Sequence, residues 1–78
     1  MTNKQVAQLF ISGNPARAGH IRTDGNDLFS YNLKIGETRG AQKVVFNYTR
    51  SGRFFSQTTS KHVRLAEQCG AKLIEVGE

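Results

Sequence analysis

The chain has 78 residues, of which 37% are hydrophobic and 22% charged, and its formal net charge is +5. A chain of this length buries only about 60% of its unfolded surface, which argues against a deep active-site cavity. Cys69 is the one cysteine, which excludes an internal disulfide, and no apolar run approaches the roughly 20 residues that span a bilayer. We therefore expect a single domain over residues 1–78, cytoplasmic and without membrane contact.

The N-terminal segment, residues 3–11, is compatible with two kinds of element. Val6, Leu9 and Phe10 have the i, i+3, i+4 spacing of an amphipathic helix, whereas apolar residues also alternate along 7–11 as they do in a strand. The segment is too short for periodicity to decide between them. The Ser-Gly-Asn-Pro sequence that follows ends either element.

The middle of the chain predicts two antiparallel strands. The Asp-Gly pair at 24–25 is a hairpin turn signal, and residues 29–35 then alternate with a period of two. That strand would place four large side chains on one face: Phe29, Tyr31, Leu33 and Ile35. A second strand over 44–49 puts Phe46 and Tyr48 on a shared face, where we expect both rings to be core residues.

The last third predicts a helix and a final strand. Residues 53–56 either add a short strand or lead directly into the helix, and the hydroxyl-rich 57–60 segment can cap the helix start. The helix ends at Gly70, and 72–76 is prone to form a strand. The predicted fold is α+β: a small antiparallel sheet of three to four strands packed with a C-terminal helix, plus an N-terminal element that is a short helix or a further strand.

Three motifs of the chain carry a resemblance. They are Asp24-Gly25, Leu28-Phe29-Ser30-Tyr31 and Ser56-Gln57-Thr58-Thr59-Ser60-Lys61-His62. Taken together, over residues 13–65, the chain resembles a family of small uncharacterised domains of tailed phages and other mobile elements. The resemblance implies a phage-like origin, and therefore the interior of a host cell, but no particular activity. The tail beyond Gly70 is not part of that family's pattern.

The positive charge of the chain is regional. Between Thr38 and Ala66 there are six basic residues and no acidic residue, a distribution that favours nucleic acid or an acidic protein surface as partner. We predict a binding face made of these residues: Arg39, Lys43, Arg50, Arg53, Phe54, Thr58, Thr59, Lys61, His62 and Arg64. The hydroxyls and free amides at the helix start could hold a phosphate there, although such residues also serve as ordinary caps.

No catalytic or metal-binding arrangement is visible, so we expect neither enzymatic activity nor a cofactor. His20 and His62 are too few for a zinc site, and Cys69 lies seven residues after His62, about 10 Å further along a helix. We therefore expect a small binding module that contacts nucleic acid or a nucleoprotein. The alternative is a protein-directed inhibitor of a host defence complex, similar in action to an anti-CRISPR protein.

Overall fold

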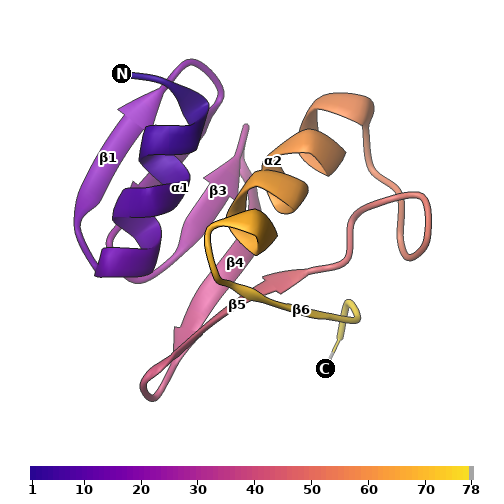
Figure 1. The fold of residues 1–78 in the computed structure, drawn as a ribbon. Coiled ribbons are helices and arrows are strands. Elements are labelled where there is room, and N and C mark those ends of the chain that lie inside the picture. Colours follow the sequence, from indigo (N-terminus) through magenta and orange to yellow (C-terminus); the bar gives the residue numbers. More distant parts are fainter. Residues whose placement is uncertain (78) are drawn as a thin grey trace.

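A computed structural model, which describes residues 1–77, shows two helices and six strands (Figure 1). In chain order they are α1 (Asn3–Ser12), β1 (Pro15–Ala18), β2 (Ile21–Asp24), β3 (Leu28–Ser30), β4 (Leu33–Arg39), β5 (Gln42–Phe46), α2 (Gln57–Gln68) and β6 (Lys72–Ile74). The strands form one sheet in the order β1-β2-β3-β4-β5-β6. The α+β class is confirmed. The expected strand number was too low, and the sheet is mixed because β6 runs parallel to β5.

The N-terminal element is a helix, and a capping box formed by Thr2 and Gln5 stabilises its start. The Thr2 side chain accepts a hydrogen bond from the Gln5 amide at 3.1 Å, and the Thr2 amide donates to the Gln5 side chain at 2.8 Å. Val6 and Phe10 are fully buried on the inner side of the helix. Gly13 then adopts a left-handed conformation with φ 82°, which ends α1.

The second helix follows directly from residues 53–56, so no strand forms there. Ser56 caps α2 by accepting a hydrogen bond from the Thr59 amide at 3.1 Å. Gly70, with φ 123°, follows the helix end, as the sequence predicts. The chain then returns to the sheet as β6, which pairs in parallel with β5, so α2 lies in the connection between these two strands.

The predicted single strand over 29–35 is wrong, since it consists of two strands. β3 ends at Ser30 and β4 begins at Leu33, which pair with each other across a turn formed by Tyr31 and Asn32. A turn of two residues leaves the alternation of the sequence unbroken, so the period of two cannot reveal it. As a result Leu28 and not Phe29 faces the core, and Tyr31 is 41% exposed.

A bulge in β4 has a further effect on the direction of side chains. Phe29 pairs with Lys34 but Leu28 pairs with Gly36, which leaves Ile35 as an extra residue. Residues three apart normally point to opposite faces of a strand, whereas here Lys34 and Glu37 share a face and form an ion pair at 2.9 Å. Ile35 still reaches the core.

Both helices pack on one face of the sheet, and the core lies between the two layers. Its members are Val6, Ala7, Phe10, Ile21, Leu28, Ile35, Val45, Val63, Ala66 and Ala71. From β5, Val45 belongs to this cluster and Val44 is also buried, whereas Phe46 is half-buried and outside the cluster, so the expectation that Phe46 is a core residue was wrong. Tyr48 lies beyond the end of β5, is half-buried and packs against the core from there. Neither helix of residues 1–77 has the length and apolar character needed to cross a bilayer.

Candidate functional site

The structure brings four of the predicted residues to one surface cavity on the exposed side of α2. Arg50, Phe54, Lys61 and Arg64 line this cavity, of about 250 Å³, together with Gln57 and Ser60. We call the first four the α2 cationic surface. The Arg50 guanidinium carbon lies 5.4 Å from the centre of the Phe54 ring, and Phe54 is 45% exposed. The α2 cationic surface therefore combines cationic groups with an exposed aromatic ring.

Helix geometry and a clamped loop position these side chains. Lys61 and Arg64 are three residues apart, so they fall on the same side of α2, while Val63 points into the core. Arg50 and Phe54 come from the loop before the helix, where the buried Asn47 acts as a clamp. The backbone carbonyl of Asn47 accepts a hydrogen bond from the Arg53 amide at 2.8 Å, and the backbone amide of Asn47 donates to the carbonyl of Ile74 at 2.7 Å.

The side chain of Asn47 completes this clamp. Its amide nitrogen donates to Ser51 at 3.2 Å, and its carbonyl oxygen accepts from the Thr49 hydroxyl. The backbone of Gly52 lies so close to Asn47 that an added Cβ would be 2.5 Å from the backbone carbonyl oxygen of Asn47. Asn47 was not predicted as a functional residue, because its neighbours in the sequence do not mark it as buried. Its burial follows from its position after β5.

Within the part of the chain that the structure describes, the charges of the α2 cationic surface have no paired carboxylate. Among residues 1–77, Arg50, Lys61 and Arg64 make no ion pair with a carboxylate, and no acidic residue lines their cavity. Each cation keeps its hydrogen-bond donors for a ligand or solvent. An anionic partner could therefore bind here without first displacing an internal counter-ion.

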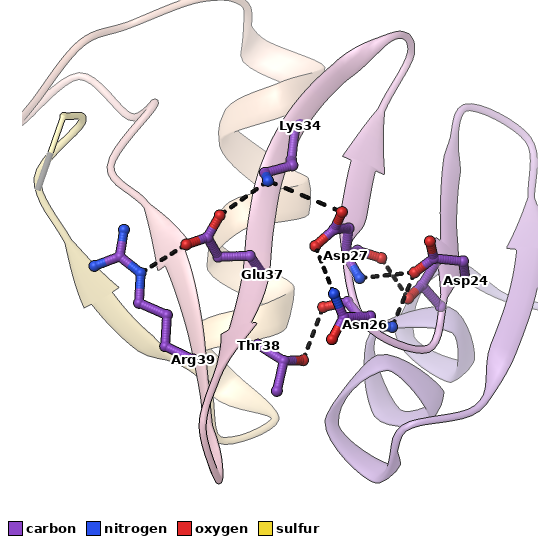
Figure 2. A network of polar contacts seen from close by, with 8 residues as sticks. Asp24, Asn26, Asp27, Lys34, Glu37, Thr38 and Arg39 are labelled. Atoms are coloured by element: carbon purple, nitrogen blue, oxygen red, sulfur yellow. Dashed lines mark hydrogen bonds and ion pairs between the residues drawn. The ribbon is translucent and has the colours of Figure 1, made fainter.

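Two of the predicted residues are occupied within the fold. Arg39 pairs with Glu37 at 2.6 Å, and Lys43 donates to the Gly25 carbonyl at 2.8 Å and to Thr38 at 2.6 Å. Figure 2 shows Arg39, Glu37 and Lys34 in a chain of polar contacts that reaches the β2–β3 turn. The hydrogen bond from Arg39, followed by that from Lys34, lowers the pKa of Glu37. Arg39 and Lys43 therefore do not belong to the α2 cationic surface.

Arg53 is also placed elsewhere. It lines a different surface cavity, of about 430 Å³, with Gly52, Glu75 and Val76. This cavity contains a carboxylate, so its local field is weaker than that beside α2. Arg53 therefore does not share a cavity with Arg50, Lys61 and Arg64, and its predicted contribution to one common face has no support from the geometry.

Thr59 and His62 lie inside the protein. Thr59 is 0% and His62 2% exposed, and both contact the fully buried Ser30, whose Oγ lies 3.0 Å from Thr59 Oγ1 and 2.6 Å from His62 Nδ1. Burial, and then the nearby His20, lowers the pKa of His62. The two residues hold α2 onto β3 and offer no surface to a ligand, while Thr58 is half-buried. The Ser30 hydroxyl is likewise closed to any substrate.

The structure has a further surface cavity that was not predicted from the sequence. The β1–β2 turn and the β3–β4 turn together form a surface cavity of about 230 Å³. Its lining consists of Arg17, Gly19, His20, Arg22, Tyr31 and Asn32. Arg17 and Arg22 lie outside the acid-free sequence window, and Tyr31 was expected within a strand. The Gly-His and Tyr-Asn dipeptides at the two turns were the available signals.

Among residues 1–77, no group of three or more His, Cys, Asp or Glu side chains is close enough together to hold a metal ion. Comparisons of the chain with protein-family models, with curated proteins and with solved structures each found no match.

Proposed function

We propose that this protein is a small binding module without catalytic activity that contacts nucleic acid through the α2 cationic surface. The observation that carries the proposal is that Arg50, Lys61 and Arg64 line one cavity together with the exposed Phe54, and that no carboxylate is among its lining residues. Guanidinium and ammonium groups bind backbone phosphates, and an exposed ring stacks on an unpaired base. A phage-like origin and action inside a host cell belong to the same proposal.

A single strand is the form of nucleic acid that this surface favours. Stacking on Phe54 requires a base that is not paired, whereas the three cations contact the backbone of any strand. With three phosphates neutralised, the logarithm of the affinity should fall with the logarithm of the salt concentration with a slope of about −2 for single strands. A duplex of the same length should bind more weakly.

Fluorescence anisotropy with a labelled single-stranded oligonucleotide tests the proposal. The variant Arg50→Ser/Lys61→Ser/Arg64→Ser should bind at least tenfold more weakly. The control variant Lys4→Ser/Arg53→Ser/Lys72→Ser also loses three cations, at exposed positions outside the α2 cationic surface, and should change affinity less than threefold. Equal losses in both variants would mean that only net charge matters, and unchanged affinity in the first would reject the α2 cationic surface.

One observation favours a second candidate, the protein-directed inhibitor. Phe54 and Phe55 are adjacent in sequence and 45% and 58% exposed, and exposed aromatic rings beside arginine are common at the centre of protein interfaces. A pull-down from host lysate, with and without nuclease, separates the two functions. Recovery of one protein in spite of nuclease, and its loss in a Phe55→Ser variant, would support an inhibitor of a host nucleoprotein. Recovery that nuclease abolishes would support direct nucleic acid binding.

A further inference from the structure

The cavity between the β1–β2 and β3–β4 turns has a built geometry of its own. Because β1 and β3 both run antiparallel to β2, the turns that follow them lie at the same end of the sheet (Figure 1). His20 comes from the first turn and Tyr31 from the second, and their rings stack with centroids 4.5 Å apart and planes 19° from parallel. The stacked pair joins the two turns.

Tyr31 is in an unusual conformation for a large side chain. Its φ is 57°, and it is the one residue other than glycine among residues 1–77 with a positive φ. Its amide donates to the His20 carbonyl at 2.7 Å, and its carbonyl accepts from Arg22 Nη1 at 2.7 Å. Glycine or asparagine would form this turn with less strain. The position instead carries a ring that is 41% exposed, as strained residues at binding sites often do.

Two arginines complete the cavity. Arg17 and Arg22 are direct partners across the β1–β2 ladder, so their side chains lie on the same face of the sheet. The bond to Tyr31, together with the Phe29 ring 4.6 Å from its guanidinium carbon, holds Arg22 in place. Neither arginine forms an ion pair within residues 1–77, and no carboxylate lines the cavity. Two adjacent guanidinium groups without counter-ions are suited to an anion such as phosphate.

We propose that this cavity binds one nucleotide unit, with its phosphate on Arg17 and Arg22 and its base on the stacked rings of Tyr31 and His20. The volume, about 230 Å³, is below the ~300–1,000 Å³ typical of sites for drug-sized ligands, so the cavity is too small to enclose a dinucleotide cofactor and would leave part of a single nucleotide exposed. This inference goes beyond the proposed function, because the site is made of different residues and stands even if the α2 cationic surface binds no nucleic acid.

A titration of the full chain followed by amide NMR tests the site with three probes: inorganic phosphate, adenosine 5′-monophosphate and a single-stranded adenine octanucleotide. We expect saturable shifts at the amides of Tyr31 and His20, with phosphate at least tenfold weaker than the mononucleotide. Shifts with the mononucleotide would indicate a free nucleotide as ligand, and shifts with the octanucleotide alone would indicate a unit within a strand. The proposal is overturned if neither nucleotide probe shifts these amides, or if phosphate binds as tightly as both.

Variants separate this site from the α2 cationic surface. Tyr31→Asn keeps a residue that tolerates the left-handed conformation but removes the ring, so binding of whichever nucleotide probe is effective should weaken at least tenfold. Tyr31→Phe keeps the ring and should bind like the parent chain. The exposed Arg17→Gln should also weaken binding tenfold and serves if Tyr31→Asn fails to fold. Wild-type affinity in Arg17→Gln would contradict the assigned phosphate contact.

The triple serine variant of Arg50, Lys61 and Arg64 provides the reciprocal control. With the mononucleotide it should leave the shifts of Tyr31 and His20 unchanged, and with the octanucleotide the same shifts should still saturate, even where the affinity falls because the contacts at α2 are lost. If this variant abolishes the shifts at Tyr31 as well, the second site is not independent and the inference fails, while the proposed function survives. If the shifts persist but no oligonucleotide binds to the parent chain through α2, the proposed function fails and the inference survives.

Discussion

Replacing Ser30 with alanine should destabilise this protein far more than the loss of one small hydroxyl suggests. Ser30 Oγ lies 2.6 Å from His62 Nδ1 and 3.0 Å from Thr59 Oγ1, and all three residues are buried. Thr59 keeps the hydrogen bond from Ser56, but His62 Nδ1 would be left buried without a partner, which costs about 1–3 kcal/mol. With the lost bond to Thr59, about 0.5–1.5 kcal/mol more, the expected decrease in the free energy of unfolding is about 1.5–4.5 kcal/mol.

That decrease is large for a domain of this size, whose total stability should be about 4–12 kcal/mol. Urea unfolding followed by circular dichroism measures it, with an unchanged m-value as the sign that only stability has altered. Ser12→Ala is the matched control, since the Ser12 hydroxyl makes only exposed hydrogen bonds, to carbonyls of its own helix and from Asn14, and it should stay within about 0.5 kcal/mol of the parent. A Ser30→Ala variant equally close to the parent would refute the reasoning.

A second replacement tests the origin of the cost. In Ser30→Ala/His62→Leu both partners become apolar, so no buried group is left unsatisfied, and the double variant should be less destabilised than the sum of the single variants. Simple additivity would mean that the hydrogen bond between Ser30 and His62 contributes nothing beyond packing.

Three further predictions concern other parts of the chain. Because the folded state lowers the pKa of His62, the contribution of His62 to the free energy of unfolding should be constant above the ordinary value of 6.5 and fall as the pH drops below it, and His62→Gln should remove that fall in urea titrations. Gly25→Ala should cost more than ~1 kcal/mol and more than Gly40→Ala, since both have positive φ but only at Gly25 would a Cβ meet a backbone oxygen, that of Gly13, at 2.7 Å. Arg39→Ser should leave oligonucleotide affinity within about threefold by anisotropy, because that guanidinium is already paired; a larger loss would place Arg39 in the binding surface.

The features that local signals determine were predicted from the sequence. The helix was predicted from the hydroxyl-rich segment near its start and the glycine at position 70, although the cap is Ser56 and not a residue of 57–60, and the β2–β3 turn was predicted from Asp24-Gly25. An antiparallel strand pair was also expected in the middle of the chain, but the residues of β4 that pair with β5 are 36–39, beyond the predicted strand over 29–35. For the helix and the turn, the residues that specify the structure lie within a few positions of it, so the sequence pattern reports them directly.

The errors arise where distant residues decide. The alternation over 29–35 continues through the Tyr31-Asn32 turn, and a tyrosine with a positive φ is opposed to its own conformational preference, so only the tertiary contacts to His20 and Arg22 account for it. The parallel pairing of β6 depends on a crossover of the whole α2 segment. Neither feature has a local signature.

The predicted site was limited by a similar effect. A sequence window without acidic residues is not a surface without them, because Glu37 lies just outside the window and still reaches Arg39. The acid-free window grouped Lys61 with Arg64, which do line one cavity, but the same stretch also contains Thr59 and His62, which point inward. A pattern of residue types therefore located the helix that carries the candidate surface but not which of its sides was available.

The two outer strands of the sheet have a consequence for how copies of the protein behave toward one another. The edges are β1, with four residues, and β6, with three, so each exposes few free backbone groups. β1 begins with Pro15, which has no amide proton to donate, and β6 begins with the exposed, charged Lys72. Short edges with proline and lysine discourage edge-to-edge pairing between sheets. The protein should therefore resist aggregation into intermolecular sheets, even at high concentration.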